Sequence, residues 1–215
     1  MKKAKPNSYM RTWAVVAAPI RFFNRIKVTG AENIPADSGY MIAANHIAAK
    51  DVLLIGASCS RQIRFIAKKE LFKIPILSSI MRSFGAVKLD RKGGDVAAIR
   101  TSIDLIKSGH LVAIFPQGHR NPGVEPANTV IHHGAGLIAH KAECDVIPVC
   151  IKTSGHKYRI FKRIEIIFGK PIPYSALGFS HGGKEEYKKA TEIIFNSILS
   201  LGGFPMLPEA DKEDN

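Results

Sequence analysis

The chain alternates short apolar runs with longer amphipathic segments, and this alternation limits its folding more than any other feature. Five runs bounded by turn residues, as buried strands are, read YMIAAN, QIRFIAK, GAVKL, HLVAIFP and DVIPVCIKT. DVLLIGASC, ELFKIPILSSIMRSF, DVAAIRTSIDLIKSG and GAGLIAHKAE predict helices between them. YRIFKRIEIIFGKPI predicts one or two more strands, and KEEYKKATEIIFNSILSLG a last helix. This order predicts a single α/β domain with a mainly parallel central sheet flanked by helices.

Two terminal segments differ from this central domain, which we assign to residues 31–203. Residues 1–30 contain seven Lys or Arg and no Asp or Glu, mixed with aromatic and aliphatic side chains. This mixture suits an amphipathic segment in a membrane interface, but also a helix packed on its own core, and both readings stay open. The run WAVVAAPI is too short to span a bilayer, and no small-residue cleavage site follows it. Residues 204–215 form a polar, acidic tail.

The balance of charge indicates an anionic partner. The formal net charge is +13, which suits nucleic acid, an acidic membrane surface or a phosphorylated substrate, and charge alone does not choose among them. The three cysteines match no zinc pattern and their number is odd, so we expect buried thiols rather than disulfides or a metal cluster.

The stretch NHIAAKD, residues 45–51, is a candidate for general-base chemistry. If His46 lies in a loop and Asp51 in the first turn of the next helix, the carboxylate can accept the imidazole Nδ1–H and leave Nε2 free as a base. The alternative is a helix-capping aspartate beside an unrelated histidine. The spacing alone leaves both possibilities open.

Two further polar loops follow apolar runs, and ligands bind at the carboxyl ends of parallel strands. Arg91 follows GAVKL and Arg120 follows HLVAIFP, so two guanidiniums could clamp a phosphate, although each alone also suits a solvated surface. No GxSxG nucleophile motif is present, which favours direct attack by a substrate hydroxyl. The G-x-G-x-x-A match in GAGLIA lies too late in the chain for a nucleotide site, and the histidines lack metal-ligand spacing.

In this order, NHIAAKD, GAVKLDR, IFPQGHR and VIPVCI resemble the four motif blocks of the glycerolipid acyltransferases. The similarity covers roughly residues 25–170 and includes FIAKKELFKIPILSSIMRSFGAVKLDR. It implies transfer of a fatty acyl group from acyl-CoA or acyl carrier protein to a lysophospholipid hydroxyl, with 1-acyl-glycerol-3-phosphate as the expected acceptor. It also implies no metal, no cofactor beyond the acyl-donor substrate, no nucleic acid partner, and a peripheral position on the cytoplasmic face of the cell membrane.

The resemblance also implies a role for each matching residue. His46 is the implied general base and Asp51 its orienter, and Gly118 lies near the oxyanion. Gly85, Arg91 and Lys68 shape or charge the phosphate site, and Pro148 lines the acyl-donor side. The full set of implied substrate-binding residues is Asn45, Lys68, Gly85, Arg91, Phe115, Pro116, Gln117, Gly118, Arg120 and Pro148.

The third block departs from the family pattern Phe-Pro-Glu-Gly-Thr-Arg at two positions, Gln117 and His119. Gln117 keeps a carbonyl that can accept a hydrogen bond from a substrate hydroxyl, but it lacks the charge to pair strongly with arginine. These changes leave the identity of the acceptor open. The sequence also leaves open the acyl chain length, the acyl donor and the oligomeric state. Two other classes of function are alternatives: a non-catalytic basic module for anionic lipid or nucleic acid, and a hydrolase that uses His46 and Asp51 on water.

Overall fold

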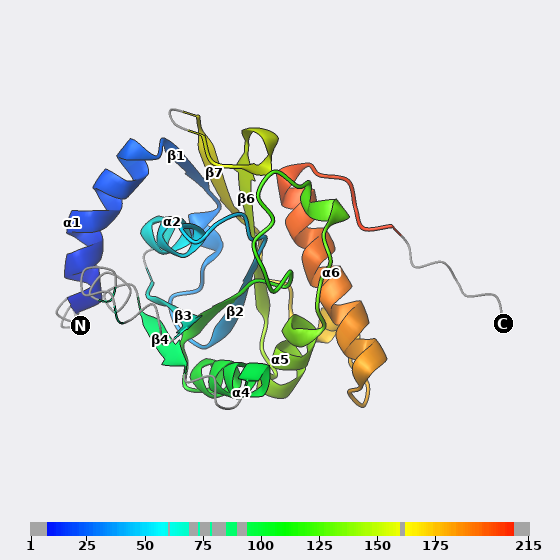
Figure 1. Cartoon of the computed structure of the whole chain (residues 1–215). Helices are drawn as coiled ribbons and strands as arrows, with labels where there is room; N and C mark the ends of the chain where they lie inside the picture. Colours follow the sequence, from blue (N-terminus) through cyan, green and yellow to red (C-terminus); the bar gives the residue numbers. More distant parts are fainter. Residues whose placement is uncertain are drawn as a thin grey trace.

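A seven-stranded sheet forms the centre of the protein, with helices on both faces (Figure 1). The computed structural model describes residues 8–59, 61–68, 73, 78, 85–89, 94–159 and 162–208. The strands are β1 (Ile26–Thr29), β2 (Tyr40–Ala44), β3 (Ile63–Lys68), β4 (Ala86–Leu89), β5 (Leu111–Ile114), β6 (Val146–Thr153) and β7 (Ile164–Phe168). The α-helices are α1 (Ser8–Phe23), α2 (Asp51–Ser58), α4 (Gly94–Lys107), α5 (Gly134–Ala142) and α6 (Lys184–Gly202). Short 3-10 helices among the described residues span Ala31–Asn33, Pro126–Asn128, Ser154–His156 and Tyr174–Leu177.

The strand order is β1-β7-β6-β2-β5-β3-β4, and only the β6–β7 pair is antiparallel among the described strands. The prediction of an α/β domain with a mainly parallel sheet is therefore confirmed. The predicted helix ELFKIPILSSIMRSF lies outside the described residues, apart from residues 73 and 78. The end of the predicted tail, residues 209–215, also lies outside them.

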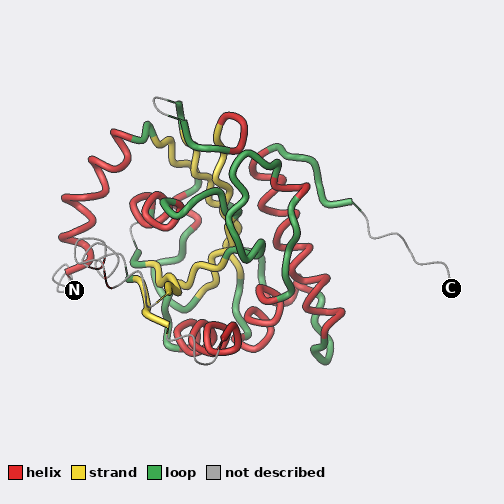
Figure 2. Tube along the Cα trace, viewed as in Figure 1, coloured by secondary structure: helices red, strands yellow, loops and turns green. Residues whose placement is uncertain are grey.

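Strand β2 has apolar residues at consecutive positions because helices cover both of its faces. Met41 and Ala43 belong to the core beneath α5 and α6, whereas Ile42 and Ala44 belong to the core on the side of α2. Figure 2 shows these layers, with the strands between the helices. Burial on both faces is typical of parallel strands. Packing on both sides holds β2 in place, and the end of β2 sets where the following loop leaves the sheet.

Strand β1 lies inside the basic segment of residues 1–30 and was not expected as a strand. It pairs in parallel with β7, with Ile26 opposite Ile164 and Val28 opposite Ile166. The end of that segment is therefore part of the sheet. Helix α1 precedes it, and its Ala17 and Ile20 pack against Leu53 and Ala57 of α2. None of the described helices is long and apolar enough to cross a membrane.

The three cysteines are buried and free, as expected from their number and spacing. Burial raises the pKa of Cys59, Cys144 and Cys150 to about 12 in each case. The folded protein therefore keeps all three thiols protonated at neutral pH, and they act as small apolar side chains.

Candidate active site

Two of the predicted loops meet at one edge of the sheet. Strands β2 and β5 are parallel neighbours, so the loop after Ala44 and the loop after Ile114 leave the sheet at the same end. A backbone hydrogen bond of 2.9 Å from the Asn121 N–H to the His46 carbonyl joins the two loops. The third predicted loop contains Arg91, which lies outside the described residues.

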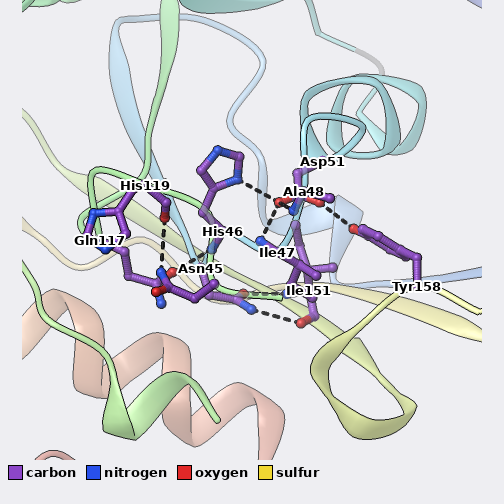
Figure 3. Close-up of polar contacts among 10 residues, drawn as sticks. Asn45, His46, Ile47, Ala48, Asp51, Gln117, His119, Ile151 and Tyr158 are labelled. Atoms are coloured by element: carbon purple, nitrogen blue, oxygen red, sulfur yellow. Dashed lines mark hydrogen bonds and ion pairs between the residues drawn. The ribbon is translucent and has the colours of Figure 1, made fainter. Parts of the chain in front are cut away.

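His46 and Asp51 are in direct contact (Figure 3). His46 lies in the loop before α2, and Asp51 is the first residue of that helix. The distance between His46 Nδ1 and Asp51 Oδ2 is 2.7 Å. The predicted contact, with the histidine outside the helix that carries the aspartate, is confirmed. Because the carboxylate accepts the Nδ1 proton, the other ring nitrogen, Nε2, is the one that can take a proton from a substrate.

The Asp51 carboxylate is fully buried and is surrounded by donors. Its Oδ2 also accepts the backbone N–H groups of Ile47, at 2.6 Å, and Ala48, at 2.9 Å. The Tyr158 hydroxyl donates to its Oδ1 at 2.5 Å. The alternative of a helix-capping aspartate beside an unrelated histidine is therefore wrong, because the carboxylate holds the imidazole and the two backbone N–H groups that it binds lie in the loop before the helix. Four hydrogen bonds compensate for the burial of a negative charge.

The imidazole of His46 is also held on its flat face. The Phe115 ring stacks on it, with ring centroids 4.0 Å apart and an interplanar angle of 16°. The His46 side chain is 13% exposed, so the ring is packed tightly but a ligand can still reach it. Phe115 was predicted to bind the acceptor, and the structure places it as one wall of the histidine site.

Tyr158 was not found from the sequence. It lies in the loop between β6 and β7, and Lys50 Nζ lies 3.9 Å from the centre of its ring. Burial raises the pKa of Tyr158 far above its usual range, and the nearby negative charge of Asp51 raises it further. The phenol therefore stays protonated as a donor. Burial lowers the pKa of Lys50, an effect that Asp51 partly offsets. The Lys50 ammonium also donates to Asn24 Oδ1 at 3.3 Å.

Gln117 does not occupy the role expected of it. Its side chain is 1% exposed, and both ends of its amide bind protein groups. Its Oε1 accepts the His46 backbone N–H at 2.6 Å, and its Nε2 lies 2.6 Å from Thr129 Oγ1, to which it donates. The prediction of a substrate contact through this carbonyl is therefore corrected: Gln117 fixes the backbone of the histidine loop (Figure 3).

Asn45 is a second predicted substrate contact that the structure places inside the protein. Its side chain is 1% exposed and forms a two-way bridge to Ile151 of β6. Asn45 Nδ2 donates to the Ile151 carbonyl at 2.9 Å, and the Ile151 N–H donates to Asn45 Oδ1 at 2.7 Å. This pair extends the sheet contact by one residue beyond the end of β2, so Asn45 fixes where the histidine loop begins.

The rest of the third block forms a tight turn. The Gly118 N–H donates to the Phe115 carbonyl at 2.9 Å, and Gly118 has a φ of +70°, a conformation that favours glycine. Because this N–H closes the turn, an oxyanion donor here must be a neighbouring group. Pro116 is buried, and its carbonyl accepts the His132 N–H at 2.8 Å. Arg120 is exposed on the same loop.

The other predicted residues have varied surroundings. Gly85 is buried with a φ of +80°, and a Cβ there would lie 2.6 Å from the Ile63 carbonyl oxygen. Pro148 is buried within β6 opposite Ala43, and the Gly169 N–H donates to its carbonyl at 2.8 Å, so its contacts are with the sheet. Lys68 ends β3, and its side chain lies outside the described residues. Within the described part of the chain, no three His, Cys, Asp or Glu side chains gather as metal ligands.

Comparison with known proteins places this site in a family. The family model described as Acyltransferase matches residues 25–152, which is more than half of the chain and contains both members of the dyad. The chain belongs to the acyltransferase family. The resemblance read from the four motif blocks is thereby confirmed, and so is the class of enzyme, an O-acyltransferase.

Relatives of this acyltransferase cover most of its length. A protein of Bacillus subtilis named 1-acyl-sn-glycerol-3-phosphate acyltransferase is 32% identical over 180 residues, covering 82% of this chain and 87% of the relative. A protein of the same name from Borreliella burgdorferi is 32% identical over 129 residues, 59% of this chain and 51% of the relative. The crystal structure of the 1-acyl-sn-glycerophosphate (LPA) acyltransferase PlsC from Thermotoga maritima has a TM-score of 0.62 and 26% identity, covering 89% of this chain and 82% of that one.

Proposed function

We propose that this acyltransferase transfers a fatty acyl group from an acyl thioester, acyl-CoA or acyl carrier protein, to the free hydroxyl of 1-acyl-sn-glycerol-3-phosphate, giving phosphatidic acid. The observation that carries the proposal is the contact between His46 and a fully buried Asp51, at the end of two neighbouring parallel strands. The shared names of the Bacillus and Borreliella relatives support the acceptor.

In the proposed reaction, His46 Nε2 removes the proton of the acceptor hydroxyl as that oxygen attacks the thioester carbonyl. Asp51 stabilises the imidazolium that forms, and its own charge is held by the Tyr158 hydroxyl and two backbone N–H groups. When the tetrahedral intermediate collapses, the carbon–sulfur bond breaks and the imidazolium protonates the departing thiolate. The proton count balances without a covalent intermediate on the protein.

The phosphate of the acceptor is assigned to cations near this edge. Arg120 supports this assignment because it is exposed on the loop that bonds to the His46 backbone. Arg91 and Lys68 remain part of the proposal from the motif pattern. Arg binds phosphate through two parallel charge-assisted hydrogen bonds, so Arg120→Lys would weaken binding even though the charge is kept.

The same proposal places the enzyme at the membrane surface, on the cytoplasmic leaflet. A fatty acyl chain gains about 0.8 kcal/mol for each methylene that leaves water, so the lysophospholipid acceptor resides in the bilayer. The net charge of +13 favours a surface of anionic lipids. Exposed cations and exposed apolar side chains support contact through residues 8–27: Val15, Arg21, Phe22, Phe23 and Lys27.

A substrate panel tests the proposal. The purified chain is incubated with each acyl donor and with lysophosphatidate, lysophosphatidylglycerol or lysophosphatidylcholine, and products are identified by mass spectrometry. We expect phosphatidic acid from lysophosphatidate and far less product from lysophosphatidylcholine, whose zwitterionic head group has no net charge and a bulky choline on its phosphate. Free fatty acid without acylated lipid would identify a hydrolase instead. Product from another acceptor alone would overturn the assignment of lysophosphatidate.

A further inference from the structure

The outward face of α1 is apolar although it faces away from the protein. Val15, Phe22 and Phe23 are 73%, 78% and 80% exposed. The opposite face of the same helix is occupied, because Ala17 and Ile20 pack against α2. Figure 1 shows α1 at the margin of the molecule, outside α2. Large exposed apolar side chains gathered on one face mark an interaction surface.

A cationic hollow adjoins this apolar face where α1 leads into the edge strand β1. The cationic hollow has a volume of about 760 Å³. Its lining residues are Arg21, Phe22, Arg25, Ile26, Lys27, Val28 and Arg163. Four of these side chains are cationic and none is acidic. Glu165 is opposite Lys27 in the strand register, but within the described residues no ion pair joins them. The charge of the hollow is therefore positive.

We propose that the cationic hollow binds the phosphate of an anionic phospholipid in the bilayer, while Phe22 and Phe23 enter the boundary between head groups and acyl chains. The complementarity has two parts that a bilayer surface satisfies together: an anionic head-group layer for the cations and an apolar layer for the rings. The proposal deepens the peripheral membrane attachment under "Proposed function" and rests on it.

The position of the hollow suits this role. Helix α1 packs on α2, and α2 begins with Asp51. The Asn24 side chain, which lies between Arg21 and Arg25 in the chain, accepts a hydrogen bond from Lys50 in the histidine loop. A bilayer bound at this junction would lie against the same helical layer that carries the dyad, so lipid substrates would have a short path to His46.

Vesicle sedimentation of the full chain tests the proposal. The test variant is Arg21→Gln, Lys27→Gln, Arg163→Gln, three exposed cations that line the hollow. The matched control is Lys107→Gln, Lys141→Gln, Lys184→Gln, which removes the same charge from exposed positions on α4, α5 and α6. Both are compared with the wild type on phosphatidylcholine vesicles with and without phosphatidylglycerol, at low and high salt.

Each surface cation contributes about a fivefold gain in binding to anionic membranes, so the test variant should lose on the order of a hundredfold in affinity for the phosphatidylglycerol vesicles. The control should lose less than about fivefold, because its cations lie away from the contact. Equal losses in the two variants would contradict the proposal and assign binding to the overall net charge. Loss of oligonucleotide binding in the test variant, with vesicle binding unchanged, would also overturn it.

A second variant tests the apolar part. Phe22→Ser, Phe23→Ser should weaken binding to both kinds of vesicle, because the rings act on acyl chains rather than on charge. Activity on lysophosphatidate dispersed in detergent separates this proposal from the proposed reaction. We expect both variants to keep wild-type activity in detergent. If the chain proves inactive while the vesicle results hold, the reaction is wrong and the docking site stands. If the chain is active but both variants bind vesicles as the wild type does, the docking site is wrong and the proposed reaction stands.

Discussion

The Tyr158 hydroxyl donates a hydrogen bond of 2.5 Å to Oδ1 of Asp51, across 107 positions of the chain. Asp51 uses its other oxygen for His46, so the tyrosine and the histidine hold opposite sides of one buried carboxylate. The β6–β7 loop therefore contributes to the orientation of the dyad although it belongs to none of the four motif blocks.

Tyr158→Phe should lower kcat about tenfold with little change in KM, because the ring and its packing stay while a hydrogen bond to a charged group is lost. Steady-state kinetics with lysophosphatidate measure this. Tyr174→Phe is the matched control, since that hydroxyl contacts His140 rather than the dyad. The effect should disappear in a His46→Ala background if Tyr158 acts through the base. A loss of the same size in that background would show that the tyrosine acts only on the fold.

Gln117→Leu should destabilise the protein by about 2–3 kcal/mol, because the substitution leaves the His46 N–H without its acceptor and removes the donor to Thr129, whose hydroxyl keeps only the Pro126 carbonyl. Urea denaturation measures this loss, and kcat should fall with it because the histidine loop is no longer fixed. Thr129→Val removes the hydroxyl that bonds Gln117 and the Pro126 carbonyl but leaves the His46 N–H bonded to Gln117, so kcat should fall less than in Gln117→Leu. A Gln117→Leu protein of normal stability with a raised KM for the acceptor would instead support the direct substrate contact that the sequence predicted.

Asn45→Asp should also destabilise the fold, by roughly 2–4 kcal/mol at neutral pH. The Asn45 amide donates to the Ile151 carbonyl, and a carboxylate at the same place would face that oxygen with no proton to share. Stability measured between pH 4 and pH 8 should improve at the acid end as the new carboxyl gains its proton, relative to the wild type. No difference between the two proteins across this range would contradict the bridge.

The sequence predicted which segments carry the site better than it predicted what each side chain touches. His46 and Asp51 were placed correctly because a helix start and a preceding loop limit their geometry to a few arrangements. Gln117 and Asn45 were misassigned because a motif shows which residues lie near a site but not which way they point. Tyr158 had no local signal, since its partner lies on another element. Strand β1 was missed because Ile26–Thr29 follows a basic helical segment and pairs only through the distant β7.

The buried cysteines give a prediction about reactivity. The thiols have a pKa of about 12 in the folded protein, above the value of roughly 8.5 for an exposed cysteine. The stability that comes from burying them in the protonated form is present below pH ~8.5 and is lost as the pH rises toward the folded value. At pH 8, a thiol reagent should label all three slowly in the native protein and quickly in urea. Fast labelling of any one in the native state would contradict its burial.

Single-turnover acylation of lysophosphatidate by His46→Ala measures whether His46 is the general base of acyl transfer. His181→Ala, at an exposed position outside the site, is the matched control. Removing the base should slow formation of phosphatidic acid by about 10²–10⁴-fold while lysophosphatidate still binds, and the control should keep the wild-type rate. A His46→Ala enzyme that forms phosphatidic acid as fast as the wild type would exclude His46 as the general base.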